Sequence, residues 1–254
     1  MGKQTAPIKL NVRYIEGDYS RLPERTATID LHSAKLALLL VDVQNDFLSE
    51  AGMYDAKGAN IDQVRTIVEP TRRVVEACRR RGVKIVYTQH CFRSDLCDVG
   101  AGWANASDLR SLVHRGQVAP GTKVGPKDVP AEKLGSLIRG TWNAAIIDEL
   151  APREGDIIID SKHKYTAFYQ TDLELILRTL GIEALLIGGV STAVCVESTL
   201  RDAYFRDFLC VLLTDCTWEK TADLQVASET IVKLHFGCAT TSSEVVKALI
   251  EETS

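Results

Sequence analysis

The sequence lacks long apolar runs, clusters of basic residues and internal repeats. No apolar run approaches the ~18 residues that a transmembrane helix needs, so we expect no membrane partner. Lys and Arg are scattered along the chain and the formal net charge is −4, so we expect no nucleic-acid partner. Residues 1–21 have no apolar core and carry acidic side chains, so no targeting segment is expected.

The chain also lacks Cys-x-x-Cys pairs, although it contains seven cysteines. Without that spacing, the cysteines indicate reduced thiols and a cytoplasmic protein, and their odd number leaves at least one thiol free. Cys91 and Cys97 are close in sequence but do not have the spacing of a redox pair.

What the chain does contain is a regular alternation of strand-like and helix-like segments, with 45% hydrophobic residues. This alternation predicts one doubly wound, Rossmann-like α/β domain with a mostly parallel six-stranded sheet and helices on both faces. The expected strands span residues 36–41, 84–88, 156–160, 184–187, 209–213 and 236–240. The expected helices span residues 61–81, 142–150, 171–180, 221–235 and 242–251, with a further helix from residue 195 onward.

Local signals refine two of these helices. Pro70 predicts a kink or a break within residues 61–81, because proline has no N–H to donate inside a helix. Thr171 and Glu174 have the spacing of a capping box, and Gly181 is a typical helix stop.

Two segments do not follow the alternation. Residues 1–33 are predicted to form an N-terminal arm outside a domain that spans residues 34–254, and residues 10–14 are a strand or an extended arm that could contact another subunit. Residues 93–140 form a long irregular stretch, which in a compact domain is typical of a lid or a pocket wall. Three arginines there could bind a substrate carboxylate or remain solvated: Arg110, Arg115 and Arg139.

Cys195 lies where a predicted buried strand is followed by a predicted helix. The strand at residues 184–187 ends in two glycines, and Val196, Leu200 and Tyr204 then recur with helical spacing. Backbone N–H groups and the helix dipole would favour a thiolate at such a helix start. The alternative is that Cys195 is a small apolar side chain packed under the turn.

Two further polar residues follow predicted parallel strands, namely Asp42 and Lys162. The carboxyl ends of such strands meet in one crevice, so Asp42, Lys162 and Cys195 are expected to converge there. A carboxylate can accept a thiol proton, and a nearby ammonium lowers the pKa of both groups. Asp42 could instead cap a turn.

Three stretches resemble the isochorismatase-like cysteine hydrolases, a family that includes nicotinamidases, N-carbamoylsarcosine amidohydrolases, biuret hydrolases and ureidoacrylate amidohydrolases. The stretches are LLLVDVQNDF (38–47), DSKHKYTAFYQTDLELILRTLGI (160–182) and LLIGGVSTAVCVESTLRDAYFRDF (185–208). With the intervening pattern, the resemblance covers about residues 34–250.

The resemblance implies a catalytic triad in which Cys195 is the nucleophile, Asp42 is the acid-base group and Lys162 is the cation. Lys162 matches the family pattern better than Lys164, because it stands at the family's spacing before Tyr165-Thr166-Ala167-Phe168. The resemblance also implies a cis peptide bond between Val190 and Ser191. The backbone N–H groups of Ser191 and Cys195 would then form an oxyanion hole.

The region after the second strand departs from the nicotinamidase pattern. Nicotinamidases bind a metal through an Asp-x-His pair and further histidines, whereas TQHCFRSD (88–95) offers His90 alone. We therefore expect neither a metal nor another cofactor.

Several residues beside these blocks are candidates for substrate binding. Gln44 and Asn45 could orient Asp42 or a substrate amide, or could cap the turn; His90 and Phe168 could equally be structural. The full set is Gln44, Asn45, Phe47, His90, Trp142, Tyr165 and Phe168.

The resemblance implies hydrolysis of a C–N bond in a small linear amide, with a ureido or carbamoyl compound as the expected substrate and ammonia or an amine as a product. It also implies a homo-oligomer, either a dimer or a tetramer. Two alternatives stay open: an amidase for nicotinamide or another small amide, and a non-catalytic binding protein that keeps the fold.

Overall fold

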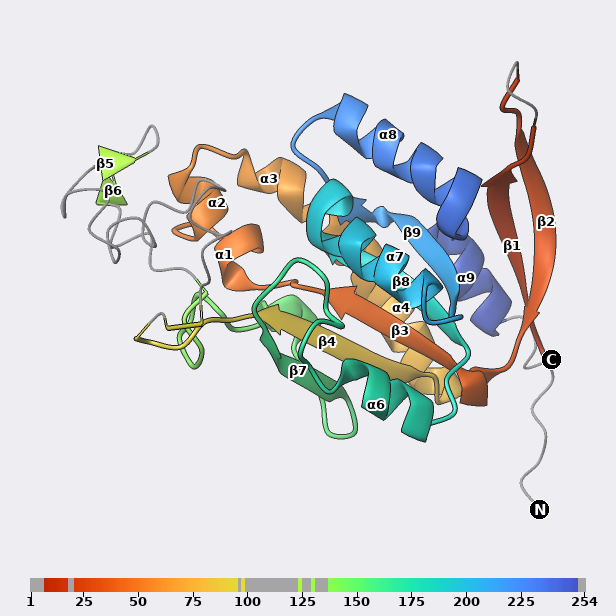
Figure 1. Cartoon of the computed structure of the whole chain (residues 1–254), viewed down its shortest axis with the longest axis horizontal. Helices are drawn as coiled ribbons and strands as arrows, with labels where there is room; N and C mark the ends of the chain where they lie inside the picture. Colours follow the sequence, from red (N-terminus) through yellow and green to blue (C-terminus); the bar gives the residue numbers. More distant parts are fainter. Residues whose placement is uncertain are drawn as a thin grey trace.

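The computed structural model describes residues 7–17, 21–95, 97–98, 123–124, 129–130 and 137–250. Within them, one main sheet has the strand order β2-β1-β10-β9-β8-β3-β4-β7 (Figure 1). Its strands are β1 (Ile8–Ile15), β2 (Glu24–Leu31), β3 (Leu36–Val41), β4 (Lys84–His90), β7 (Ile157–Lys162), β8 (Ala184–Val190), β9 (Leu209–Trp218) and β10 (Cys238–Thr240). A separate pair joins β5 (Lys123–Val124) to β6 (Val129–Pro130).

The predicted doubly wound, mostly parallel sheet is confirmed, but the predicted number of six strands is wrong. The six strands from β10 to β7 in the sheet order are parallel to one another. The other two are β1 and β2, which pair as an antiparallel hairpin from Ile8↔Leu31 to Ile15↔Glu24. β1 adds to the edge beside β10 in antiparallel orientation, so most of the described part of residues 1–33 belongs to the sheet.

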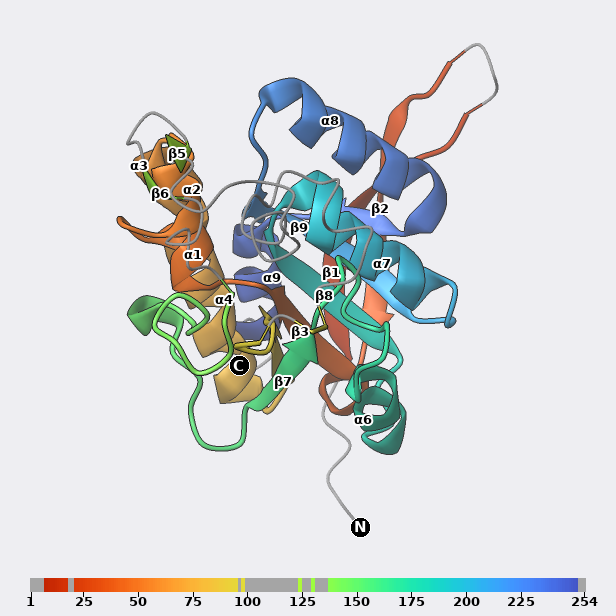
Figure 2. The same cartoon turned by 60° about the vertical axis from the view of Figure 1, so that its left-hand side comes forward.

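Helices cover both faces of the sheet, as Figure 1 and Figure 2 show. One face carries α4 (Val68–Arg81) and α9 (Ser242–Ile250), and the other carries α6 (Leu173–Thr179), α7 (Glu197–Tyr204) and α8 (Ala222–Ile231). The π-helical segments η6 (Thr192–Val196) and η7 (Val232–Phe236) adjoin α7 and α8. The short helices are η1 (Ser33–Lys35), α1 (Asn45–Leu48), α2 (Met53–Ala56), α3 (Ile61–Val64), η2 (Arg65–Ile67) and η5 (Asp148–Leu150).

The central strand β3 explains why its sequence is continuously apolar. Leu36, Leu38 and Leu40 point into the core shared with α4 and α9. The alternate side chains, such as Leu39 and Val41, point into the core shared with α6 and α7. A strand buried on both faces has no polar face, so its sequence shows no polar alternation.

The break expected in residues 61–81 is present. The chain passes from α3 through the 3₁₀ segment η2 into α4, and Pro70 lies in the first turn of α4, where it removes no internal hydrogen bond. The stop at Gly181 is also confirmed, since this glycine follows the end of α6 with φ of +67°.

Two local predictions are wrong. Residues 142–150 are not a helix beyond η5, because their backbone bonds to the α1 segment: Asn45 N–H donates to Ala145 O and Asp46 N–H donates to Asn143 O. The capping box at Thr171 does not form, because α6 begins two residues later and Glu174 instead accepts from Arg206 Nε at 2.7 Å. Tertiary hydrogen bonds thus occur in both segments beside the local ones that remain, such as Leu173 N–H to the Thr171 hydroxyl.

Candidate active site

Three polar residues meet at the carboxyl edge of the parallel strands. Asp42 follows β3, Lys162 is the last residue of β7, and Cys195 lies in η6 after β8. The strands β8, β3, β4 and β7 are consecutive in the sheet, so these positions are neighbours although they are far apart in sequence. β7 runs two residues beyond its predicted end, and Lys162 therefore lies within the strand.

The Lys162 ammonium is the centre of this group. Its Nζ donates to Asp42 Oδ2 at 2.6 Å and to Cys195 Sγ at 3.4 Å. It also lies 3.2 Å from His90 Nδ1. Asp42 and Lys162 are completely buried, and Cys195 is 6% exposed. The structure thus brings together the three residues that the sequence singled out and places His90 beside them.

Besides its contact with Lys162, Asp42 forms hydrogen bonds through its backbone N–H and through its other carboxylate oxygen, Oδ1. Its φ of +56° turns the chain sharply at the end of β3, and its N–H donates to Thr88 O at 3.2 Å. The Thr88 hydroxyl donates to Asp42 Oδ1 at 2.7 Å. Thr88 was missed in the sequence, where a threonine within a strand has no distinguishing pattern; its partner becomes evident only from the register that pairs Val41 with Thr88.

The charges of this group follow from burial and from one another. Burial disfavours the Lys162 ammonium, but attraction to the Asp42 carboxylate, with which it forms a hydrogen bond, outweighs burial and raises the pKa of Lys162 above its usual value. Burial and the neighbouring ammonium hold the pKa of His90 well below its usual value. His90 is therefore neutral, and its Nδ1 accepts a hydrogen bond from the ammonium.

The prediction that the helix start favours a Cys195 thiolate is wrong. Burial raises the pKa of the Cys195 thiol to about 12, and the lowering effect of Lys162 does not compensate for it. The Glu219 carboxylate also lies at the start of η6, where its Oε2 accepts from Ala193 N–H at 3.0 Å. Cys195 is thus a protonated thiol at neutral pH, and a thiol in this state would need a base to accept its proton before it could act as a nucleophile.

In the described part of the chain, one group of side chains offers atoms that could ligate a metal ion. Ligand atoms of Asp42, His90 and Cys195 lie within 4.8 Å of one another. The Lys162 ammonium, however, is in contact with all three, so a divalent ion would have to displace a buried cation. The donor set fits an ammonium better than a metal.

The peptide bond between Val190 and Ser191 is cis, as the resemblance implies. The Ser191 carbonyl accepts from Val194 N–H and from Val196 N–H, both at 3.1 Å. Ser191 Oγ lies 2.5 Å from the hydroxyl oxygen of Tyr54. Tyr54 was not among the candidates predicted from the sequence. No local pattern around Tyr54 signals this contact, because Tyr54 and Ser191 are 137 positions apart.

Gln44 and Asn45 bind the backbone around the site. Gln44 Nε2 donates to His90 O at 3.1 Å and to Ala144 O at 2.8 Å, while its Oε1 accepts from His90 N–H. Asn45 Nδ2 donates to Trp142 O at 2.8 Å, and its Oδ1 accepts from the Ser49 hydroxyl. These contacts use both amide groups to hold the segments that carry His90 and Ala144.

The aromatic candidates are not gathered in one place. The Phe47 ring is buried and lies 5.0 Å from the Tyr54 ring, and the Tyr165 ring is 6.5 Å from the His90 ring. Phe168 belongs to the core and packs on Phe208, as the structural alternative expected.

The remaining candidates lie farther out or are not described. The Trp142 side chain is mainly exposed, and it is the Trp142 carbonyl that contacts a candidate residue, Asn45. Arg139 is partly exposed and donates to Asp160 O at 3.1 Å. Arg110, Arg115 and most of the predicted lid lie outside the described residues.

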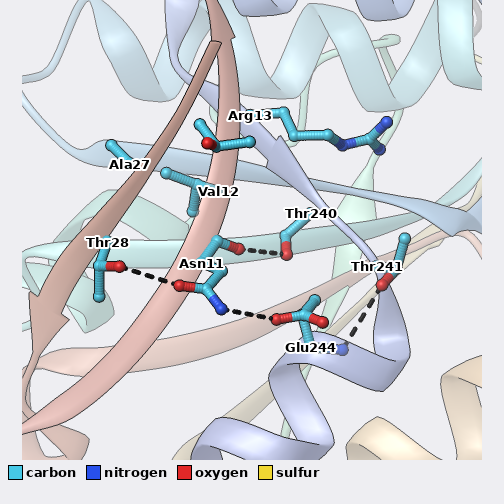
Figure 3. A pocket seen from close by; sticks show the side chains of 9 residues that line it. Asn11, Val12, Arg13, Ala27, Thr28, Thr240, Thr241 and Glu244 are labelled. Atoms are coloured by element: carbon cyan, nitrogen blue, oxygen red, sulfur yellow. Dashed lines mark hydrogen bonds between the residues drawn. The ribbon is translucent and has the colours of Figure 1, made fainter.

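A cavity of about 780 Å³ lies elsewhere, between the N-terminal hairpin and α9. Figure 3 shows its polar lining, in which Thr28 donates to Asn11 and Asn11 donates to Glu244. None of the predicted site residues lines this cavity, so its volume does not make it the candidate active site.

The sequence model of the isochorismatase domain matches residues 36–244. The chain belongs to the isochorismatase family. A ureidoacrylate amidohydrolase of Agrobacterium fabrum is 31% identical over 229 residues, which cover 88% of this chain and 93% of that protein. One of Yersinia enterocolitica is 32% identical over 222 residues, covering 85% and 90%.

Solved structures agree with this assignment. A cysteine hydrolase from Pseudomonas syringae superimposes with a TM-score of 0.70 at 26% identity, covering 87% of this chain and 95% of that one. N-carbamoylsarcosine amidase from Thermoplasma acidophilum has the same fold, with a TM-score of 0.57 at 22% identity over 82% of this chain and 96% of that one. In the described residues, no helix is long and apolar enough to cross a membrane.

Proposed function

We propose that this protein is a cysteine amidohydrolase that cleaves a C–N bond of a small ureido or carbamoyl compound. The observation that carries the proposal is the buried Lys162 ammonium, which contacts the Asp42 carboxylate and the Cys195 sulfur at once. A nucleophile, an acid-base group and a fixed positive charge within hydrogen-bond reach form a site suited to acyl transfer.

In the first half-reaction, Asp42 accepts the thiol proton and Cys195 Sγ attacks the substrate carbonyl carbon. The carbonyl oxygen becomes an oxyanion that accepts from the backbone N–H groups of Ser191 and Cys195. Asp42 then gives its proton to the leaving nitrogen as the C–N bond breaks. Ammonia or an amine departs, and the acyl group stays bound to Sγ.

In the second half-reaction, Asp42 takes a proton from water, and the resulting hydroxide attacks the acyl carbon. The C–S bond breaks, and Asp42 returns its proton to the sulfur, which restores the thiol. Lys162 stays an ammonium throughout, because its raised pKa keeps it protonated, and it compensates the negative charge that moves between Asp42 and Cys195.

The substrate class rests on the relatives and on the polarity of the site. The ureidoacrylate amidohydrolases that align with most of this chain are named for a substrate with a ureido group. The buried groups at the centre are polar, namely Asp42, His90 and Lys162. A flat, polar H₂N–CO–NH– group suits such surroundings better than a large apolar ring.

Substrate comparison tests this choice. A ureido acid or biuret is expected to be hydrolysed with kcat/KM at least about tenfold above nicotinamide, a difference of ~1.4 kcal/mol in transition-state binding. The measurement is ammonia release under one set of conditions, since a carbamate product also decomposes to ammonia. Nicotinamide as the better substrate would reject the ureido class and leave only amide hydrolysis.

Catalysis is expected to need no metal, because an ammonium takes the place at which Asp42, His90 and Cys195 could converge on an ion. Dialysis against a strong chelator should leave kcat and KM for the ureido substrate unchanged. Buffer-dialysed enzyme is the control. Activity that is lost on dialysis and restored by zinc, iron or manganese would contradict this prediction.

A non-catalytic binding protein with the same fold remains the competing function. Intact Asp42, Lys162 and Cys195 in hydrogen-bonded contact favour the enzyme, since a binding protein has no need for a thiol coupled to a carboxylate through an ammonium. Absence of ammonia release across ureides, carbamoyl amino acids and aromatic amides would favour the binding protein.

A further inference from the structure

Tyr54 joins the segment after Asp42 to the turn that carries Cys195. It lies in α2, and its hydroxyl oxygen is 2.5 Å from Ser191 Oγ. Tyr54 is itself partly buried, and its hydroxyl reaches a serine that is only 4% exposed. The hydrogen bond is therefore partly buried, which limits the competition from water.

The Tyr54 ring is held from two other elements. Its centroid lies 5.0 Å from that of Phe47, with the ring planes at 71°. On another side, it lies 6.0 Å from the ring of Trp218, the last residue of β9. Edge-to-face and tilted contacts of this kind favour one ring orientation, so the hydroxyl is directed at Ser191 before any substrate binds.

Ser191 is the point from which the catalytic turn begins. It follows the cis peptide bond, it is the N-cap of η6, and its carbonyl accepts the N–H groups of Val194 and Val196 on either side of Cys195. Any displacement of Ser191 is therefore transmitted to the backbone around the sulfur and to the Ser191 N–H, which the mechanism assigns to the oxyanion.

The opposite side of the turn has its own fixed contacts. Thr192 Oγ1 donates to Gln225 Oε1 at 2.7 Å, and Ala193 N–H donates to the buried Glu219 carboxylate at 3.0 Å. Tyr54 thus supplies the side-chain contact on Ser191, while α8 and the residue after β9 hold the next two residues. A turn held on both sides can keep the sulfur in line with an incoming carbonyl.

We propose that Tyr54 is a positioning residue for catalysis, acting through the Ser191 hydroxyl to hold the Cys195 turn in its reactive geometry. This proposal deepens the cysteine amidohydrolase function and rests on it. Burial holds the pKa of the Tyr54 hydroxyl above its usual value, so it keeps its proton throughout the neutral range and stays available for this hydrogen bond.

The test is Tyr54→Phe, which keeps the ring contacts and removes only the hydroxyl. For ammonia release from a ureido acid, kcat should fall roughly 10- to 100-fold while KM changes less than about threefold, because misplacing a reacting group acts on the transition state. Ser191→Ala, which keeps its backbone N–H, should give a similar loss. The double variant should lose no more than either single variant, since both remove one interaction.

Tyr87→Phe is the matched control. Tyr87 is a fully buried tyrosine in β4, and its hydroxyl lies 3.5 Å from Arg79 Nη2 rather than beside the turn. The kcat of Tyr87→Phe should equal that of the unmodified protein. Equal kcat values for Tyr54→Phe and the unmodified protein, or equal losses for Tyr54→Phe and Tyr87→Phe, would overturn the positioning role.

A second readout does not depend on the substrate. Alkylation of Cys195 by iodoacetamide, followed by peptide mass mapping, should be at least about threefold faster in Tyr54→Phe, because the turn that buries the thiol opens more often. If Cys195→Ala retains activity, the proposed function fails and the alkylation rate alone decides the Tyr54 proposal. An unchanged rate would then overturn it.

Discussion

Cys195→Ala and Asp42→Asn are each expected to lower kcat/KM for the ureido substrate at least ~1,000-fold, because the members of a catalytic unit fail together. The alanine variant has no nucleophile. The asparagine variant leaves a Cys195 thiol whose pKa is raised by burial and that has no base to accept its proton. Steady-state ammonia release measures both losses, and circular dichroism checks that each variant is folded.

The chain provides an internal control for the cation. Lys162→Ala should be as inactive as the other two variants, whereas Lys164→Ala should retain most of the activity. The ammonium in contact with Asp42 and Cys195 belongs to Lys162, and Lys164 lies two residues beyond the end of β7. An inactive Lys164→Ala together with an active Lys162→Ala would reject the assignment of the lysine.

Lys162→Met is expected to lower the free energy of unfolding by ~3–5 kcal/mol, since it leaves the Asp42 carboxylate buried without its cation. Asp42 is completely buried and would retain the Thr88 hydroxyl as its hydrogen-bond donor. Urea unfolding at neutral pH measures the loss. Cys195→Ala should cost far less, because it removes one sulfur atom and leaves no charge unpaired.

The pH dependence of that loss has a defined sign. The folded-state pKa of Lys162 is raised above its ordinary 10.5, so the stabilisation from its ammonium is fully present below 10.5 and is lost only as the pH rises through the folded-state value. The difference between unmodified protein and Lys162→Met should therefore not decline between about pH 6 and pH 9.

A double variant shows whether the unpaired Asp42 charge causes the loss of stability in Lys162→Met. Asp42→Asn combined with Lys162→Met removes both charges and should recover much of the lost stability, although not the activity. If the double variant is as unstable as Lys162→Met, the loss reflects poor packing of the methionine and the unpaired-charge explanation is wrong.

Local sequence patterns were sufficient for the elements at the centre of the sheet. β3 was predicted with its observed bounds because a strand buried on both faces must be apolar throughout. The helix stop at Gly181 followed from the left-handed conformation that glycine adopts without a steric penalty. Such features depend on neighbouring residues, and they are therefore visible in the sequence.

The hairpin and the 142–150 segment depended on distant partners. β1 is stabilised by β2 and by β10, and β10 lies more than 220 residues later in the chain. The 142–150 segment has helix-compatible residues, but hydrogen bonds to Asn45 and Asp46 determine its backbone instead. A periodicity analysis contains no information about such partners.

The carboxyl ends of parallel strands made Asp42, Lys162 and Cys195 candidates in the sequence, and the family resemblance favoured Lys162 over Lys164. The charge states of these residues could not be predicted from the sequence. Whether an ammonium lowers a thiol pKa depends on the balance between its attraction and the burial of the sulfur, and burial prevails at Cys195. Tyr54 and Thr88 entered the site only through tertiary contacts, because hydrogen bonds to Ser191 and Asp42 across such separations have no local signature in the chain.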